Sequence, residues 1–533
     1  MVQAFTAGGE NISKKRWLTN RPFPNLGGAI GGDEGCYEIR LPSGETFITT
    51  KTARRAFCII GSVRPLSLLA LLSVCAVAAA QASPEDIQKI VHEGKDRNQA
   101  MRTLKGLTDM GPRLTTSPTL RRAQDWAMGK FRSYGLKNVH LDEAFTAPVG
   151  FERGRHQSAR MIAPFESEMQ FTTLNWMPGT RGKQRGKAVM APTSLAEVEA
   201  HKADLKDAWV IMPDATWSMR GPTLPAATDE EGKKLRAAID ACGIMGRVFG
   251  ARDERLHTHG NWRDKTYEKH PEGGANLMVA VRKSDHDRIV RNLDFGRPVV
   301  LEFEAENRFI KGPIQQYNVV ADIPGTEKPD EMVIVCGHFD SWNSPGSQGA
   351  CDNGTGATQA IEAARILMAS GVKPKRTVRF ILWSGEEQGL LGSRGYVERH
   401  KAEMPNISAV LNDDEGTNYQ SGYVGTAEMK PMMETAFAPT VAAFPDMPMK
   451  FTVVEKLPTR ANSDNAPFAE LGVPGFLIEE AGRADYGVVW HTQFDRYEFA
   501  VPEYMVQAST NHAVVAFTLA QAPTLLPRAA PVR

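Results

Sequence analysis

The sequence is poor in cysteine, which excludes a disulfide framework as the basis of the fold. It has 6 cysteines in 533 residues, and half of them precede residue 83. The spacings of the remaining three match no cysteine zinc motif; these residues are Cys242, Cys336 and Cys351. The sequence leaves open a single disulfide bond, such as one between Cys336 and Cys351, in an oxidising compartment.

An excess of charge is also lacking. Lys and Arg total 63 and Asp and Glu total 62, which gives a formal net charge of +1. No basic run of the kind that grips phosphates occurs, so nucleic acid is not expected as a partner. Hydrophobic residues make up 42% of the chain, a composition typical of a globular protein rather than a disordered one.

One apolar stretch stands out at residues 64–82, which read RPLSLLALLSVCAVAAAQA. A basic residue, a short Leu/Ala/Val core and a small-x-small end are the three parts of a secretory signal peptide. The core is too short for a comfortable membrane span, and the flanks disfavour the alternative of a buried helix. We therefore expect a signal peptide at 63–82, a secreted or periplasmic protein, and no stable membrane anchor after cleavage.

The position of this segment is unusual, because signal peptides begin at the N-terminus. Residues 1–62 contain no methionine after Met1, and Val63 stands where an initiator would belong. A bacterial GTG start codon reads as valine in a conceptual translation. The hypothesis is that residues 1–62 are a non-native upstream extension.

The rest of the chain falls into three segments. Helical periodicity marks residues 83–154, the expected N-terminal part of a catalytic domain. Short strands and charged helices over 155–312 indicate a separate inserted domain. From 313 to 525, apolar strands alternate with amphipathic helices, as in TQAIEAARILMAS. This alternation predicts an α/β fold with a mostly parallel mixed sheet flanked by helices, and with its chemistry at the carboxyl ends of the strands.

Metal-type side chains occur at four of these strand ends and in one loop. The segments are GHFD, CDNGTG, SGEEQG, NDDEG and WHTQFD, which supply His338, Asp340, Asp352, Glu386, Glu387, Asp413, Asp414, His491 and Asp495. Taken singly, each of these residues has an ordinary structural interpretation. The Glu386–Glu387 pair, for example, could simply be the solvated start of a helix. Together, buried carboxylates are costly unless they are paired or metal-bound. Two imidazoles and three carboxylates suit two Zn²⁺ ions about 3.5–4 Å apart.

The spacing suggests separate roles within this set. Strand alternation lets His338 and Asp340 point the same way, so Asp340 can orient the imidazole. Asp352 lies in a Gly-rich loop that allows close approach, which suits a bridging ligand. The adjacent Glu386 and Glu387 cannot share one direction, so one can bind metal while the other acts as general base.

The motifs GHFDSW, GACDNGTG, WSGEEQGLLGS and HTQFD resemble the co-catalytic di-zinc aminopeptidase and carboxypeptidase family, in particular its carboxypeptidase Q-like members. The resemblance covers residues 84–520 and includes FERG at 151–154. The segment LKDAWVIMP at 205–213 looks like the start of a protease-associated insert. The resemblance thus implies that residues 155–312 are a protease-associated-like domain.

The resemblance also implies site residues. One zinc would be bound by His338 and Asp414 and the other by Glu387 and His491, with Asp352 bridging them. It further implies the following: Glu386 as the catalytic base, a cis peptide bond after Asp352, and Ser463 and Asp464 near the substrate pocket. Some relatives have an oxyanion-stabilising Tyr just before the last His ligand. This chain has Trp490 there, which makes Tyr486 the candidate.

The expected activity is hydrolysis of terminal peptide bonds in short peptides or dipeptides. Aminopeptidase action and carboxypeptidase or dipeptidase action both stay open, as does a homodimer. Two alternatives are a catalytically inactive binding protein on a peptidase fold and a single-zinc acyltransferase similar to glutaminyl cyclase. Retention of the whole two-metal set disfavours both.

Overall fold

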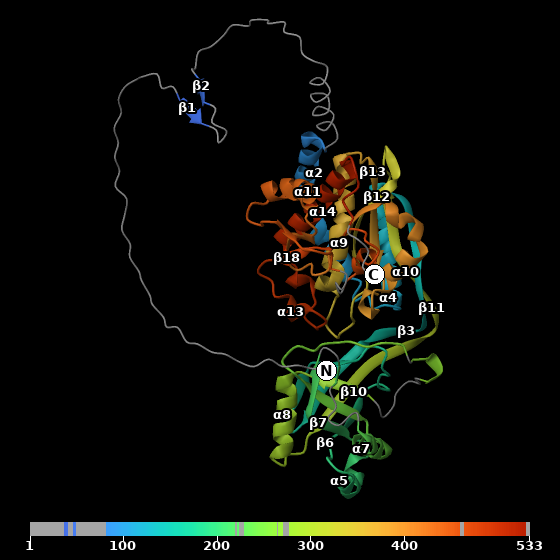
Figure 1. Ribbon diagram of the computed structural model, residues 1–533. Helices are drawn as coiled ribbons and strands as arrows, with labels where there is room; N and C mark the ends of the chain where they lie inside the picture. Colours follow the sequence, from blue (N-terminus) through green and yellow to red (C-terminus); the bar gives the residue numbers. More distant parts are fainter. Residues whose placement is uncertain are drawn as a thin grey trace, which may run out of the picture. The chain divides into compact units, whose positions relative to one another are not determined.

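The computed structural model describes residues 37–40, 46–49, 82–218, 221–222, 229–263, 265–269, 277–458 and 463–528. The chain divides into two compact units, Met1–Leu71 and Leu72–Arg533. In the first, β1 (Tyr37–Arg40) pairs antiparallel with β2 (Thr46–Thr49) (Figure 1). The rest of the expected extension at 1–62 lies outside the described residues, as does the expected signal peptide at 63–82 except for its last residue.

The second unit begins with three helices, α2 (Pro84–Asp96), α3 (Ala100–Thr108) and α4 (Pro118–Tyr134). Ser83 and Ser117 are the N-caps of α2 and α4, and in both cases proline follows at the first helical position. α4 ends at Gly135, whose φ of 91° is the left-handed conformation that glycine adopts without strain. These three helices agree with the helical periodicity expected within residues 83–154.

The main sheet of this unit combines strands from the segment 313–525, where alternating strands and helices were predicted, with a long strand from the N-terminal part. Its members are β3 (Lys137–Ala163), β11 (Val300–Ile323), β12 (Lys328–His338), β13 (Arg376–Trp383), β14 (Ile407–Asn412) and β17 (Gly475–Leu477). β17, β14, β12 and β13 are parallel neighbours in that order, whereas β11 is antiparallel to β13 and β3 is antiparallel to β11. The prediction of an α/β fold with a mixed sheet is confirmed.

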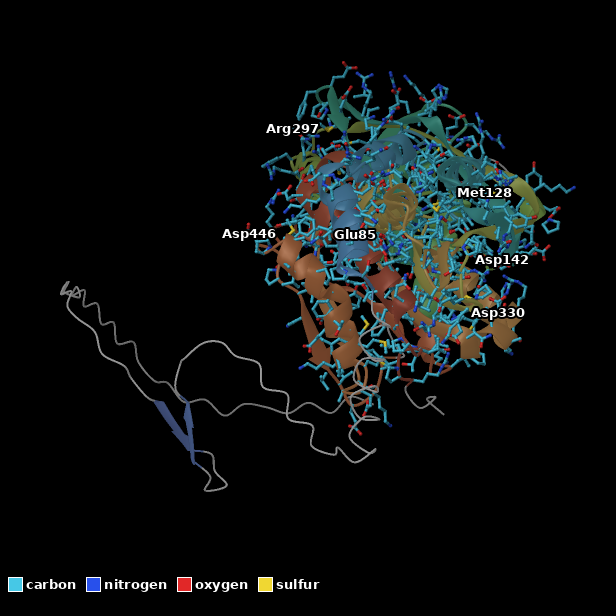
Figure 2. All side chains as sticks on the ribbon, turned by 90° about the horizontal axis from the view of Figure 1, so that it is seen from above. Glu85, Met128, Asp142, Arg297, Asp330 and Asp446 are labelled. Atoms are coloured by element: carbon cyan, nitrogen blue, oxygen red, sulfur yellow. The ribbon has the colours of Figure 1, made fainter. Side chains whose placement is uncertain are left out.

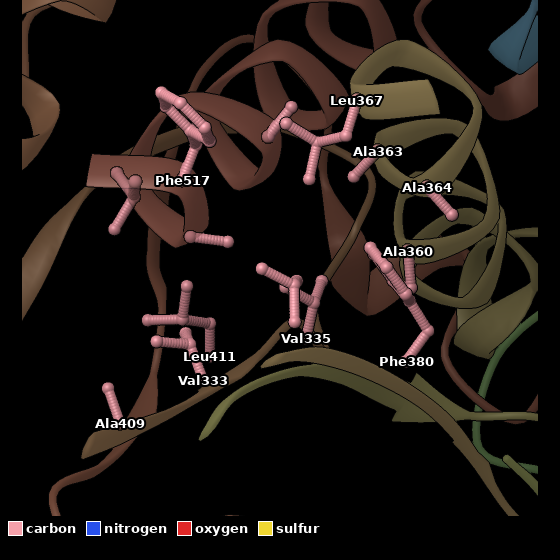
Figure 3. Close-up of a cluster of buried hydrophobic side chains, with 14 of the residues drawn as sticks. Val333, Val335, Ala360, Ala363, Ala364, Leu367, Phe380, Ala409, Leu411 and Phe517 are labelled. Carbon is pink, nitrogen blue, oxygen red and sulfur yellow. The ribbon is translucent and has the colours of Figure 1, made fainter. Parts of the chain in front are cut away.

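Helices cover both faces of this sheet. α9 (Thr355–Ser370) and α14 (Pro502–Gln521) pack on one face, where Val333 and Val335 of β12 share an apolar cluster with Phe517 of α14 (Figure 3). The alternate residues of β12, Ile334 and Cys336, belong to a second apolar cluster. That cluster includes residues of α10 (Leu391–Arg399) and α12 (Ala466–Ala469). A strand buried on both faces explains the continuous apolar run in the sequence.

The inserted segment extends the same sheet. Its elements are β4 (Ser167–Met169), β5 (Phe171–Thr173), β6 (Gln184–Met190), α5 (Leu195–Ala200), α6 (Lys202–Leu205), β7 (Trp209–Ser218), β8 (Gly221–Pro222), α7 (Glu230–Ala241), β9 (Gly246–Ala251), η1 (Tyr267–Lys269), β10 (Met278–Val281) and α8 (Lys283–Asp294). β6, β7, β9 and β10 are parallel, and β6 joins the main sheet through β11. A core of its own includes Trp209, Val248 and Val279.

The expected boundaries at 154/155 and 312/313 fall within strands rather than in linkers. β3 and β11 pair from Asp322↔Lys137 at one end to Val300↔Ala163 at the other. The two long strands therefore run from the catalytic part into the insert without a break, and bulges in the register let them bend. The assignment of this segment as protease-associated stays a prediction.

The remaining elements lie towards the C-terminus and around the strand ends. They are η2 (Ala350–Gly354), η3 (Glu386–Gln388), η4 (Lys401–Asn406), β15 (Tyr419–Gly425), α11 (Lys430–Ala443), β16 (Lys450–Val453), β18 (Glu479–Ala481), α13 (Tyr486–Val489) and η5 (Tyr497–Phe499). β16, β15 and β18 form a small separate sheet. Exposed charged residues, including Arg297, Asp330 and Asp446, lie at the margin of the unit (Figure 2).

The three cysteines among the described residues form no disulfide bond. Cys242, Cys336 and Cys351 are free thiols, so the pairing of Cys336 with Cys351 that the sequence left open does not occur. The Cys336 thiol contacts the Asn412 side-chain oxygen at 3.4 Å.

Among the described residues, no helix is long and apolar enough to cross a membrane.

Candidate metal centre

The candidate site lies where three parallel strands end. β12 ends at His338, β13 is followed by Glu386 and Glu387, and β14 is followed by Asp414. β13 lies on one side of β12 and β14 on the other, so the chain reverses its direction of sheet growth here. Such a reversal opens a crevice at the carboxyl ends of the strands, which is where α/β sheets bind ligands.

Five side chains meet in this crevice as two groups that share one member. His338 Nε2 lies 2.9 Å from Asp414 Oδ1 and 3.3 Å from Asp352 Oδ1. His491 Nε2 lies 3.1 Å from Asp352 Oδ2 and 3.2 Å from Glu387 Oε2. Within each group the candidate ligand atoms lie within 4.8 Å of one another. The structure thus brings together all five residues predicted as ligands, and Asp352 offers one oxygen to each group.

The loop that carries Asp352 is held from two sides. The expected cis peptide bond is present between Asp352 and Asn353. The Asn353 side chain donates to the carbonyl oxygen of Asp413 at 2.7 Å and accepts from the amide of Gly356 at 3.0 Å. On the other side, Asp495 Oδ1 accepts from the amide of Cys351 at 2.5 Å. These bonds fix the backbone on either side of the shared carboxylate.

A buried arginine closes the longer loop between His338 and Asp352. Arg113 donates through Nε to the carbonyl of Phe339 at 2.7 Å and through Nη2 to the carbonyl of Gly349 at 2.7 Å. Its side chain has no solvent exposure, and burial lowers its pKa to about 10. Arg113 therefore ties the start of this loop to its end.

Asp340 differs in detail from the expectation. His338 Nδ1 contacts the backbone oxygen of Asp340 at 2.9 Å, whereas the Asp340 carboxylate is 3.8 Å away. That carboxylate instead accepts from Thr115 Oγ1 at 2.5 Å and from the amide of Glu386 at 3.3 Å. The reason is that β12 ends at His338, so strand alternation does not extend to Asp340. Asp340 still orients the imidazole, but through its main chain.

Glu386 and Glu387 diverge, as expected of adjacent residues, because a tight turn precedes them. Gly385 has a φ of 76°, and a Cβ there would lie 2.6 Å from the Phe145 ring, so only glycine fits. Glu387 reaches His491, while Glu386 lies on the wall of a pocket of about 970 Å³. Four of the five candidate ligands, all but His338, line this pocket, which is large enough for a short peptide.

The electrostatics of the site call for a cation. Burial, together with Asp414, raises the pKa of Glu386 well above its usual range, and burial with Asp352 raises that of Glu387 to about 7. Burial lowers the pKa of His338, but Asp414 and Asp352 outweigh that effect and raise the pKa well above its usual value. Glu387 Oε1 is buried and accepts no hydrogen bond from the described residues. Carboxylate and imidazole donors are those that zinc takes, so the residues fit divalent metal.

The predicted substrate residues divide into two kinds. Ser463, Tyr486 and Trp490 line the pocket. Asp464 is fully buried and accepts from Ser393 Oγ, and burial raises its pKa to about 8. The position of Asp464 fits support of the site better than direct contact with substrate.

Sequence reasoning missed His259, which lies close to the site. His259, in the inserted segment, places Nε2 3.3 Å from His491 Nδ1, and Trp342 lies 5.1 Å from its ring. No pattern in the sequence around His259 predicts this contact, because its partner is 232 residues away. The roles of Arg113 and Asp495 were also missed, although Asp495 belongs to the HTQFD motif.

The fold and this site together define a class: an α/β metallopeptidase, with acidic and imidazole groups gathered at the carboxyl ends of parallel strands. The profile of peptidase family M28 matches residues 318–516, the segment that holds all five candidate ligands. This segment therefore resembles the family, and the similarity of the chain to carboxypeptidase Q runs over most of its length.

Carboxypeptidase Q from Bos taurus is 29% identical over 444 residues, which cover 82% of this chain and 88% of that protein. Carboxypeptidase Q from Homo sapiens is 26% identical over 494 residues, 89% of this chain and 99% of the other. A solved structure of a peptidase M28 precursor from Shewanella amazonensis SB2B superposes with a TM-score of 0.59 at 24% identity, covering 84% of this chain and 98% of that one. The likeness to carboxypeptidase Q thus spans the insert as well as the catalytic segment.

Proposed function

We propose that the protein is a zinc-dependent metallo-exopeptidase that holds two zinc ions and hydrolyses terminal peptide bonds of short peptides or dipeptides. The observation that carries the proposal is the position of Asp352, whose two oxygens face different imidazoles at 3.3 and 3.1 Å. A carboxylate shared between two ligand groups is what a bridging ligand requires. His338 and Asp414 would hold one ion, and Glu387 and His491 the other.

Zinc, when bound, supplies Lewis acidity that polarises a carbonyl and lowers the pKa of water. The protein's own contribution to proton transfer is Glu386. It lies on the pocket wall beside the ligand groups and binds neither imidazole, so it is free to accept a proton from the attacking water. The same carboxyl group then returns the proton to the leaving amine. Its backbone is held by the bond from its amide to the Asp340 carboxylate.

The developing oxyanion needs a donor on the pocket wall. Tyr486 is the first residue of α13 and lines the pocket. Burial raises the pKa of its phenol well above the usual value, and the nearby Asp352 carboxylate raises it further. A phenol that keeps its proton is a hydrogen-bond donor at every working pH. Tyr486 is therefore the donor proposed for the oxyanion, with Trp490 beside it.

Export and assembly belong to the same proposal. The signal-like segment at 63–82 supports a secreted or periplasmic enzyme whose mature chain begins near residue 83. A homodimer stays open. N-terminal sequencing of the native protein tests the start site; a mature terminus within residues 2–60 would contradict the hypothesis that the segment before 63 is non-native.

The function is tested by hydrolysis with residues 83–533 and a panel of matched dipeptides. The panel contains free dipeptides, the same dipeptides with blocked N-termini, and the same with amidated C-termini. Loss of activity on N-blocking alone indicates aminopeptidase action, and loss on C-amidation alone indicates carboxypeptidase action. Loss on both indicates a dipeptidase. Absence of hydrolysis in every arm, together with absence of bound metal after zinc is added back, would favour a binding protein instead.

A further inference from the structure

The inserted segment contacts His491 on the side opposite the candidate metal site. Its Nε2 faces Asp352 and Glu387, at 3.1 and 3.2 Å. Its Nδ1 faces Nε2 of His259 at 3.3 Å. The two ring nitrogens of one candidate ligand thus have different partners, one set from the catalytic segment and one from the insert.

The tautomer of this pair follows from its geometry. A metal-binding nitrogen carries no proton, so when Nε2 of His491 binds metal its proton is on Nδ1. That N–H points at His259 Nε2, which must then be the acceptor. His259 in turn carries its own proton on Nδ1. The arrangement leaves His259 Nε2 engaged with the far side of the ligand, so His259 does not itself reach the metal.

The backbone around His491 is held by the same part of the insert. The amide of Thr258 donates to the carbonyl oxygen of His491 at 2.8 Å, and Arg255 Nη1 donates to that of Gly487 at 2.8 Å. Gln493 accepts from the amide of Leu256 at 2.8 Å and donates to the carbonyl of residue 254 at 2.9 Å. His491 has a φ of 59°, a conformation that a non-glycine residue keeps only when its surroundings enforce it.

The insert loop is itself anchored away from the site. The indole of Trp217 donates to the carbonyl oxygen of His257 at 2.7 Å. The amide of Asn175 donates to that of His259 at 2.7 Å, and the hydroxyls of Thr172 and Thr258 lie 2.7 Å apart. The loop from 254 to 259 is thus fixed to the insert core on one side and to the ligand-bearing segment on the other.

We propose that His259 is a positioning residue of the metal centre, which accepts the Nδ1 proton of His491 and holds its Nε2 towards Asp352 and Glu387. The insert then completes the zinc site rather than only shaping access to it. This inference rests on the proposed function, because the quantity it governs is the zinc affinity of that site. Partners of this kind typically change metal affinity about 10- to 100-fold.

The test is competition of purified apo protein against a chromogenic chelator, which reports the two zinc affinities without any need for turnover. His259→Leu should lower one of the two affinities 10- to 100-fold and leave the other unchanged. His259→Gln, whose amide oxygen can accept the same proton, should restore most of the loss. His257→Leu, in the same loop but with no hydrogen bond to His491 among the described residues, is the matched control and should keep both affinities close to those of the wild type.

Three results separate the two proposals. Wild-type affinities for both zinc ions in a folded His259→Leu protein contradict this inference alone, as does a His259→Gln protein no better than His259→Leu. A wild-type chain that binds no zinc contradicts the proposed function as well. If His259→Leu does not fold, histidine ¹⁵N spectra of the zinc-loaded wild type decide: a bare Nε2 on His259 is expected, and a protonated one overturns the inference.

Discussion

Arg113 Nη2 donates to the carbonyl oxygen of Gly349 at 2.7 Å, three residues before the shared carboxylate of Asp352. The same guanidinium donates to the carbonyl of Phe339, the residue after His338. One side chain therefore sets the spacing between two candidate ligands that lie 14 residues apart in the sequence (352 − 338). The loop between them needs no regular structure because this cross-link replaces it.

Replacing Arg113 should damage both stability and metal binding. Arg113→Met leaves buried carbonyls without donors, so the free energy of unfolding should fall by about 3 kcal/mol. Urea denaturation of the apo protein measures the loss, and chelator competition measures the weakened zinc binding. Arg121→Met, which removes an exposed arginine paired with Asp125, is the control and should change stability by less than about 0.5 kcal/mol. Equal stability of the two variants would contradict the cross-link.

Asp352 should be the residue whose loss removes most metal. Asp352→Ala takes one oxygen from each group, so zinc content measured by atomic absorption should fall at both sites. Asp413→Ala changes a neighbouring buried carboxylate that accepts from Gln420 at 2.6 Å and belongs to neither group, so it should retain zinc if it folds. Retention of one full zinc in Asp352→Ala would show that the carboxylate serves a single ion.

Glu386 should separate metal binding from turnover. Glu386→Gln preserves shape and removes the proton acceptor, so kcat should fall by about 10²- to 10⁴-fold with zinc content unchanged. Steady-state kinetics on a dipeptide and metal analysis of the same sample give both quantities. Glu415→Gln, which alters another carboxylate on the pocket wall, is a comparison that should retain far more of kcat. Full zinc with a near-normal rate in Glu386→Gln would remove Glu386 from the mechanism.

A charged histidine away from the site predicts how stability depends on pH. Hydrogen bonds from His400 to Asp142 at 3.0 Å and to Glu403 at 3.1 Å raise its pKa to about 9. Because the folded pKa lies above the unfolded value of about 6.5, the stabilisation is complete below pH 6.5 and is lost as the pH rises through 9.

Its expected size follows from the shift and the exposure. One pKa unit corresponds to about 1.4 kcal/mol, and 26% of the His400 side chain is exposed, so we expect a loss of about 2 kcal/mol between pH 6.5 and 9.5. Denaturation at several pH values should show this slope in the wild type and not in His400→Gln. His92→Gln, on the exposed surface of α2, is the control and should keep the wild-type slope. Parallel curves for wild type and His400→Gln would refute the assignment.

How far the sequence predicted the molecule depended on whether the determining interactions were local. The strand ending at His338 and the turn before Glu386 follow from short patterns of apolar residues and glycine, and the grouping at one sheet edge follows from parallel pairing. The partner of His338 Nδ1 was predicted as a carboxylate and is a carbonyl, because the strand ends at His338, two residues before the Asp340 that the alternation assumed it to include.

The interactions that escaped prediction are non-local. His259 meets His491 across 232 residues, and β3 and β11 carry the sheet through boundaries that a change in sequence texture had placed at 154 and 312. Neither has a periodicity of its own to read. The course of β3 and β11 follows bulges in their register, whose positions no short motif marks.

Graded zinc reconstitution measures how many zinc ions the hydrolysis requires. Apo protein comprising residues 83–533 is loaded with increasing zinc, and bound metal and dipeptide hydrolysis are measured on the same samples. Binding should saturate at two zinc ions per chain, and hydrolysis should reach its maximum only there. Saturation at one ion with full activity, or two bound ions with no hydrolysis of any peptide in the panel, would contradict a di-zinc exopeptidase.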